Sequence, residues 1–201
     1  ARTISKIAAA LLLAGSQSAY SIIDDYSTGP GEGGADQIDD VWQSVFNGWG
    51  LVATEDEDND GCSNLVECIA GSDPRNPGDC LTVGNIVIGG ANIIFSFDAQ
   101  KGKRYQIWQS DSPVGAPPGA GWSEVGGAEK LATADGADTL VFPKPGNAKK
   151  FYRLEAKDAD TDSDGISDWS EYKTGSNPNE GTSIGNASGG TANDLDTLKS
   201  L

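Results

Sequence analysis

The sequence contains no histidine. Histidine is the commonest general base in enzymes and the commonest side-chain ligand of transition metals. Its absence excludes a Ser-His-Asp or Cys-His catalytic arrangement, and it also excludes a zinc site built on imidazole. Carboxylates can still carry acid–base chemistry, so the composition disfavours an enzyme without excluding one.

Cationic residues are also scarce. The 201 residues include 14 Lys and Arg against 30 Asp and Glu, which gives a net charge of −16. Nucleic acids and anionic membrane surfaces are poor partners for such a chain, whereas divalent cations are natural ones. The length allows one medium domain or two small ones, and 37% hydrophobic residues is too polar a composition for a membrane protein.

Long hydrophobic runs are missing, and one short run stands near the N-terminus at residues 7–14. It follows Arg2 and Lys6 and precedes small residues, with plausible cleavage after Ser18 or Ser21. This pattern predicts an export signal at residues 1–21, and hence a secreted, periplasmic or cell-surface protein. The alternative of a buried or membrane-spanning helix is disfavoured because the run is too short to span a bilayer.

Cysteine is limited to Cys62, Cys68 and Cys80. In an exported chain, three cysteines favour one disulfide and one free thiol. The sequence leaves the pair open, although Cys80 is the expected common member because it lies beyond the turn at residues 71–77. A zinc site made of these cysteines alone matches no usual spacing.

An internal repeat is the most informative feature that is present. Residues 56–74 align without a gap with residues 160–178, at an offset of 104 residues (160 − 56). Both copies read D-x-D-x-D-G-x-S, carry Glu at the twelfth place and continue as G-S-x-P. Like charge packed this densely is unfavourable unless a cation lies among it.

The repeated pattern matches what calcium requires of one twelve-residue loop. Such a loop supplies side-chain oxygens from positions 1, 3 and 5, a backbone carbonyl from 7, a side chain or water at 9 and a bidentate Glu at 12, with Gly at 6 for the turn. Magnesium suits this loop less well because it is smaller, and a solvated acidic turn without metal is the plain alternative. The predicted ligands of two Ca²⁺ ions are Asp56, Asp58, Asp60, Cys62 (carbonyl), Asn64 and Glu67, and Asp160, Asp162, Asp164, Ile166 (carbonyl), Asp168 and Glu171.

The rest of the chain predicts a mainly β fold. Short alternating segments separated by turn residues favour a small antiparallel β-sandwich of the fibronectin type III or immunoglobulin kind. Its aromatic side chains are expected to form the core. The alternative for Trp108 or Trp122 is that the ring stacks on a glycan. A short helix is expected after Asp39 and Asp40, ending near Asn47, and one helix should follow each loop. Strands are expected at residues 81–88, 92–98, 104–109, 122–125, 139–142 and 151–156, and helices at Asn64–Ala70 and Asp168–Thr174.

Each calcium loop therefore resembles half an EF-hand, because it runs into a short helix but is not entered from a regular one. The two loops are not adjacent in sequence, and the chain lacks methionine, so a sensor that opens a hydrophobic groove is not indicated. The predicted organisation is a signal peptide (1–21), a flexible linker (22–36), a helix with the first loop (37–80), the sandwich (81–157), the second loop (158–178) and a tail or linker (179–201), which leads on to a further domain if the chain is a fragment.

The repeats resemble the thrombospondin type 3-like calcium repeats of large secreted proteins from environmental bacteria. In those proteins such loops border small β-sandwich modules with a G-K/R-x-Y-x-[VI] strand, a later Trp and a closing [RK]-F-Y-R-[LV] strand; here these are residues 102–107, Trp122 and residues 150–154. The resemblance covers roughly residues 36–178. It departs from the pattern at Cys62 and Cys68, and no catalytic domain is recognisable.

These observations predict a non-enzymatic, secreted calcium-binding spacer, with one ion stiffening the junction at each end of the sandwich. The alternative is a carbohydrate- or protein-binding accessory module of a larger extracellular protein. A glycosidase that uses two carboxylates is the least favoured reading, because nearly all the clustered acids are assigned to calcium. Expected partners are calcium and, in the alternative, a polysaccharide or another extracellular domain.

Overall fold

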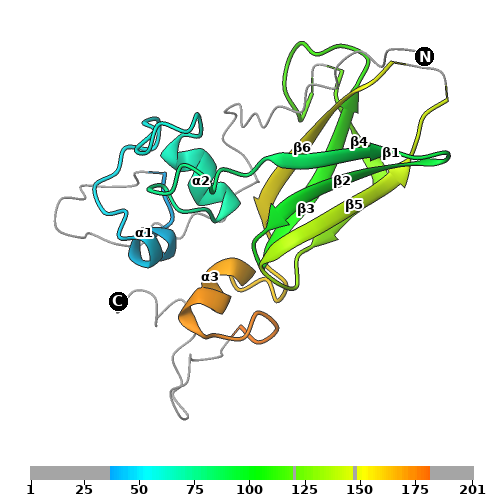
Figure 1. Ribbon diagram of the computed structural model, residues 1–201. Helices are drawn as coiled ribbons and strands as arrows, with labels where there is room; N and C mark the ends of the chain where they lie inside the picture. The colour runs from blue at the N-terminus through cyan, green and yellow to red at the C-terminus, as the bar shows by residue number, and fades with distance from the viewer. Residues whose placement is uncertain (1–36, 120, 147–148, 182–201) are drawn as a thin grey trace.

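A computed structural model of the chain describes residues 37–119, 121–146 and 149–181. The predicted signal peptide, the linker at 22–36 and residues 182–201 of the tail lie outside the described residues. Six strands and three short helices are present in this part of the chain (Figure 1). In chain order they are α1 (Asp40–Phe46), α2 (Asn64–Ala70), β1 (Val83–Ile88), β2 (Asn92–Ala99), β3 (Lys103–Ser110), β4 (Ser123–Leu131), β5 (Gly136–Pro143), β6 (Phe151–Asp158) and α3 (Asp168–Thr174).

The strands form two antiparallel sheets of three strands each, in the orders β1-β2-β5 and β4-β3-β6. In the first sheet, Phe95 of β2 pairs with Ile86 of β1 and with Leu140 of β5. In the second, all eight residues of β3 pair with β6, from Lys103 opposite Asp158 onward. The expected small antiparallel β-sandwich is confirmed. Strands β4 and β5 are much longer than expected, β2, β3 and β6 extend by one or two residues, and β1 begins two residues later than expected.

The sandwich core lies between the two sheets. Alternation along β2 buries Phe95 and Phe97, and the Phe95 ring packs edge-on against Phe142 of β5 and Tyr152 of β6, with centroid separations of 5.3 and 5.9 Å. Aromatic contacts across the two sheets hold the layers in one register. The aromatic core expected from the sequence is confirmed for Phe95, Phe97, Tyr105, Phe142 and Tyr152. Trp108 and Trp122 are buried outside this cluster, and Phe151 is only half-buried.

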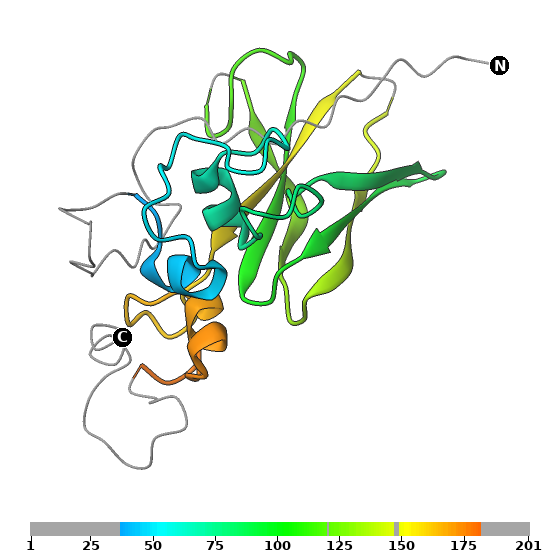
Figure 2. The same ribbon diagram turned by 60° about the vertical axis from the view of Figure 1, so that its left-hand side comes forward.

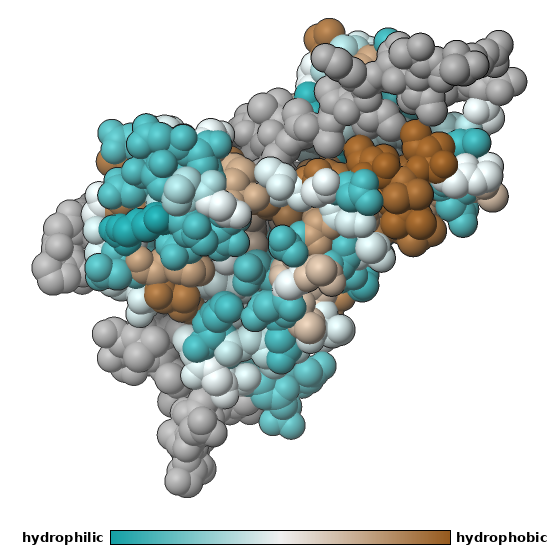
Figure 3. Space-filling view, viewed as in Figure 1, coloured by the Kyte–Doolittle hydropathy of each residue, from teal (hydrophilic) through white to brown (hydrophobic). Residues whose placement is uncertain are grey.

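The outer face of the first sheet is different in character. Val87 and Val141 are each nearly half exposed, and both pair with Ile94 of β2 between them. Figure 3 shows apolar side chains gathered over the β1–β2 hairpin. None of the helices in the described ranges has the length and apolar character that crossing a membrane requires.

The three helices begin and end where their capping residues stand. Asp39 caps α1 by accepting a bond from the Trp42 amide, and Ser63 and Ser167 cap α2 and α3 in the same way. Gly71 and Gly175 close α2 and α3 in the left-handed conformation. The predicted helix bounds are confirmed, because strong caps at both ends leave little freedom in where a helix stops.

The sequence predicted one repeat at each end of the sandwich, and this prediction is wrong. The two repeats meet at one end, where α1, α2 and α3 gather beside the sheets in both views (Figures 1 and 2). A second buried cluster joins Trp42 of α1, Cys68 of α2 and Trp169 of α3. The register of the strands explains this placement. Val83 at the start of β1 faces Phe97 near the end of β2, and the first residue of β3 faces the end of β6. Because β2 turns directly into β3, the chain enters and leaves the sandwich at the same end.

Candidate metal centres

The two loops, residues 56–67 (the first loop) and residues 160–171 (the second loop), share one backbone shape. Asn59 and Ser163, at position 4, both have φ of 64°. Gly61 and Gly165, at position 6, have φ of 99° and 98°. A Cβ resists these angles at position 6, so glycine there allows the chain to turn back over its own carboxylates.

The turn aims backbone N–H groups at the first carboxylate of each loop. Asp56 accepts bonds from the amides of Asn59 (2.8 Å) and Gly61 (2.9 Å). Asp160 accepts the equivalent bonds from Ser163 (2.7 Å) and Gly165 (3.1 Å). The position-1 carboxylate therefore organises the loop from within, as an ion-binding loop requires.

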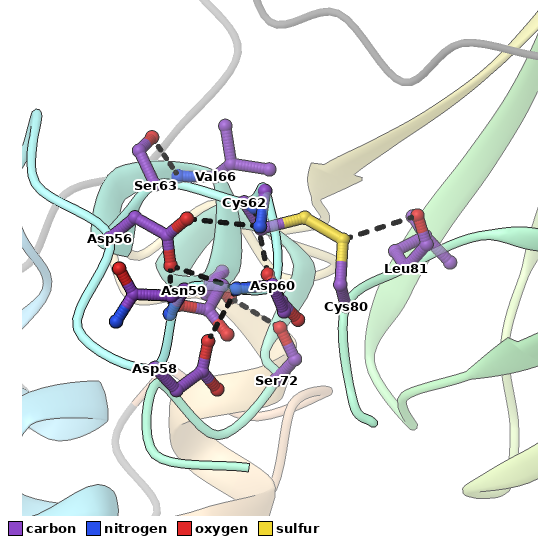
Figure 4. The surroundings of a disulfide bond; sticks show 12 residues. Asp56, Asp58, Asn59, Asp60, Cys62, Ser63, Val66, Ser72, Cys80 and Leu81 are labelled. Atoms are coloured by element: carbon purple, nitrogen blue, oxygen red, sulfur yellow. Dashed lines mark hydrogen bonds between the residues drawn. A yellow bond between two sulfur atoms is a disulfide. The ribbon is translucent and has the colours of Figure 1, made fainter. Parts of the chain in front are cut away.

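In each of the next two carboxylates of the first loop, one oxygen accepts a hydrogen bond from a loop amide and the other accepts none. Asp58 Oδ1 accepts from the Asp60 amide at 3.2 Å, and Asp60 Oδ1 accepts from the Cys62 amide at 2.8 Å (Figure 4). The Oδ2 atoms of Asp58 and Asp60 are buried and have no hydrogen-bond donor. One carboxylate oxygen from each of Asp56, Asp58 and Asp60 lies within 4.8 Å of the others.

Glu67, at position 12, is fully buried on α2. Neither of its carboxylate oxygens has a hydrogen-bond donor. Burial, and then the charges of Asp58 and Asp60, raise its pKa to about 8. A buried carboxylate without donors is costly, and a divalent cation held between Glu67 and the aspartates would offset that cost. The donor set fits calcium, which prefers a bidentate Glu among carboxylate and carbonyl oxygens.

The second loop repeats this arrangement. Carboxylate oxygens of Asp160, Asp162 and Asp164 lie within 4.8 Å of one another, and Glu171 is fully buried on α3. Asp164 Oδ1 accepts from the Ile166 amide at 2.9 Å, whereas its Oδ2 is buried without a donor. Both loops thus bring the residues predicted at positions 1, 3 and 5 together and place the position-12 Glu in the protein interior.

The side chain at position 9 fastens the first loop to the segment that enters it, whereas in the second loop it bonds to position 2 of the same loop. Asn64 donates from Nδ2 to the Val52 carbonyl at 2.8 Å. Asp168 accepts from the Thr161 amide at 2.7 Å and from the Thr161 hydroxyl at 2.6 Å. A bracing role therefore accounts for both side chains, and a ligand role, direct or through water, stays a prediction.

Position 7 is where the two loops differ most. Cys62 forms a disulfide with Cys80, with the two Cα atoms 6.1 Å apart (Figure 4). The bridge ties the first loop to the segment that leads into β1. Ile166 of the second loop is fully buried instead. The structure thus selects one pair from those left open by the sequence, with Cys80 as its expected member, and Cys68 remains as a buried thiol.

Asp73 is an acidic residue near the first site that the sequence interpretation left without a role. Burial and the nearer aspartates raise the pKa of Asp58 and of Glu67, and the charge of Asp73 adds to both shifts, so Asp73 lies in the electrostatic field of the site. Its Oδ1 accepts from the Arg75 amide at 3.0 Å. The signal was present in the repeat, where Asp73 and Asn177 stand before the same proline position.

The sequences of the two sites match a known family of repeats. Residues 56–77 and residues 160–180 each match the bacterial TSP3 repeat. This family is of the calcium-binding type, which agrees with the acidic clusters in both loops. No curated protein and no solved structure matches the chain significantly.

Proposed function

We propose that the chain is a secreted, non-enzymatic spacer module in which two calcium ions stiffen the junction between the repeats and the β-sandwich. The observation that carries the proposal is Glu67, whose two buried carboxylate oxygens have no donor. The charges of Asp58 and Asp60 act on Glu67, and each of these aspartates also has a buried Oδ2 without a donor. The family match of both loops supports the same assignment. Export is supported by the composition of residues 1–21 and by the Cys62–Cys80 disulfide.

Stiffening would follow from mass action. The folded loops would bind the ion and the unfolded chain hardly would, which adds about 2.7 kcal/mol per site at a hundredfold excess of free calcium over the dissociation constant. Because α1, α2 and α3 share one buried cluster, this free energy acts on the whole junction. Weak sites of roughly 10⁻⁴–10⁻³ M are sufficient in an extracellular fluid.

The alternative of a carbohydrate-binding module gains no support from the two tryptophans considered for glycan stacking. Trp108 and Trp122 are 6% and 7% exposed, and their indole N–H groups donate to Glu155 and to the Val114 carbonyl. A stacking platform needs an exposed aromatic face. Calcium-dependent rigidity is therefore the function that the site supports best.

Chelation tests this proposal. The thermal unfolding midpoint of the full chain should fall markedly when calcium is removed with excess EDTA, and it should return when calcium is restored. Magnesium added in place of calcium should reverse little of the decrease in the unfolding midpoint, because the loop suits the larger ion. A midpoint that does not respond to EDTA would contradict the proposal.

A further inference from the structure

A buried ion pair lies at the point where the sandwich meets the second loop. Lys103 Nζ is 2.5 Å from Asp158 Oδ1, and the two side chains are 2% and 4% exposed. Lys103 is the first residue of β3 and Asp158 is the last of β6, and the two are direct cross-strand partners. The sequence interpretation assigned neither residue a role.

The surroundings hold the lysine against its partner. Its Nζ also donates to the Cys68 carbonyl at 3.3 Å and lies 4.9 Å from the centre of the Trp169 ring. Gly71 makes room for both, because a Cβ there would come within 3.2 Å of Lys103 Cε and 2.7 Å of Trp169 Nε1. The ammonium group therefore has no short route to solvent.

A third carboxyl group, that of Asp39, is buried in the same region and interacts electrostatically with both members of the pair. Asp39 is buried, and its amide donates to the sulfur of Cys68, the residue whose carbonyl binds Lys103. Burial raises the pKa of Asp39 to about 6, and the charges of Lys103 and Asp158 act on it as well. Its oxygens accept bonds from the Trp42 amide and the Ser170 hydroxyl.

The arrangement favours chemistry that an exposed pair would not undergo. The two side chains are only 2% and 4% exposed, so water is kept away from both reacting groups. For the pair to react, one proton passes along the existing hydrogen bond from Nζ to Oδ1, which leaves an amine facing a carboxylic acid. The amine nitrogen lies 2.5 Å from an oxygen of the carboxyl group whose carbon it would attack, and reaction requires it to be held about 3–3.5 Å from that carbon. Positioning of this kind replaces the activation that amide formation in water needs.

We propose that Lys103 and Asp158 condense into an intramolecular amide bond that links β3 to β6. The nitrogen lone pair attacks Cγ of Asp158 and a C–N bond forms. The C–OH bond of Asp158 breaks, and the oxygen leaves as water with a proton that Asp39 relays from the nitrogen. Atoms balance as amine plus acid giving amide plus water, without an oxidant or a co-reactant.

Proximity alone does not carry the proposal, as a second pair in the sandwich shows. Lys130 and Asp138 form a similarly close ion pair across β4 and β5, but the lysine side chain is 43% exposed. Water solvates both charges there, and the ion pair is the stable state. Lys130–Asp138 therefore serves as an internal control that should remain unlinked.

Mass spectrometry of the full chain tests the proposal. The denatured and reduced protein should be lighter than its unlinked sequence by the mass of one water molecule. A tryptic digest should yield residues 102–104 joined to residues 158–173, with no cleavage after Lys103. Separate peptides would overturn the proposal, even with the same mass loss, because dehydration at an Asp-Gly sequence such as Asp164-Gly165 also removes one water.

Three variants sharpen the test. Lys103→Arg keeps the charge and should show the full unlinked mass. Asp158→Asn should lose the mass of ammonia instead of water if it links at all, and retention of the water loss in this variant would overturn the proposal. Asp39→Asn preserves an N-cap residue for α1 and should give folded but unlinked protein by circular dichroism and mass; joined peptides in this variant would overturn the relay role of Asp39.

Discussion

At the residue scale, the two glycines that end the repeat helices are equivalent in sequence but differ in what surrounds them. Gly71 and Gly175 have φ of 78° and 85°. An added Cβ at Gly175 would meet nothing within 4 Å, whereas at Gly71 it would come within 2.7 Å of Trp169 Nε1. Gly71 is therefore needed twice, once for its backbone angle and once for the close approach of the second repeat.

This difference yields a matched pair of variants. Gly175→Ala should lower the free energy of unfolding by about 1–2 kcal/mol, which is the cost of a left-handed alanine. Gly71→Ala should cost about 1–3 kcal/mol more, because the Trp169 indole has to move. Denaturant unfolding of both variants in calcium measures the difference. Equal losses would show that the repeats do not pack as described.

Residue types in the repeat predicted which carboxylates the fold brings together at positions 1, 3 and 5, because ion chemistry restricts ligands to oxygen donors at given spacings. The same reasoning did not reveal that Asp168 bonds to Thr161, or that Asp73 lies near the first site. The first depends on side-chain directions within the loop, and the second on the fold outside the twelve-residue window. A spacing rule carries no information on either.

At the scale of elements, the helix bounds could be predicted and the length of β4 could not. Helices α2 and α3 start at a serine cap and stop at a glycine. The sequence predicted that strand β4 ends at Val125, before Gly126 and Gly127, because two glycines are typical of a turn. In the structure β4 continues through both glycines, because pairing with β3 overrides the local preference. The register of that pairing shifts between Gln106 and Trp108.

The disulfide supplies a prediction at this scale. Cys62 offers the position-7 carbonyl of the first loop and is bonded to Cys80, so the bridge restrains one of the predicted ligands. The double variant Cys62→Ser with Cys80→Ser should lose about 3 kcal/mol of unfolding free energy. Calcium affinity should fall at the first loop, while the second loop, which has Ile166 at this position, should keep its affinity.

Calcium titrations of this variant, in which Glu171→Gln or Glu67→Gln isolates one loop at a time, separate the two effects. An equal loss of affinity at both loops would show that the bridge acts on the shared junction and not on the first loop. Unchanged affinity at both would show that the bridge does not restrain the position-7 carbonyl.

At the scale of the whole molecule, the relative placement of the repeats follows from the number of strands. Each strand of the sandwich reverses the direction of the chain, so six strands return it to the end where it entered. The six strands expected from the sequence already imply this result, and the expectation of one ion at each end of the sandwich overlooked it. The packing of Trp169 against Cys68 and Trp42, by contrast, requires the three-dimensional structure.

Because the repeats share this cluster, a substitution in the core of one repeat should weaken calcium binding at the other. Trp169→Ala should cost about 3–5 kcal/mol of unfolding free energy. It should also weaken calcium binding at both loops, although Trp169 belongs to the second. Tyr172→Ala, on the same helix but 36% exposed, is the control and should change both quantities little. Weakening at the second loop alone would mean that the repeats act independently.

The most direct measurement of the central claim is calorimetric titration of calcium into the full chain and into single-Glu variants. Two ions should bind to the wild type, and Glu67→Gln and Glu171→Gln should each remove one site. Glu57→Gln changes the same charge within the first loop at an exposed side chain, so it should retain both sites. A wild type that binds no calcium, or variants at Glu67 and Glu171 that still bind two ions, would contradict the account.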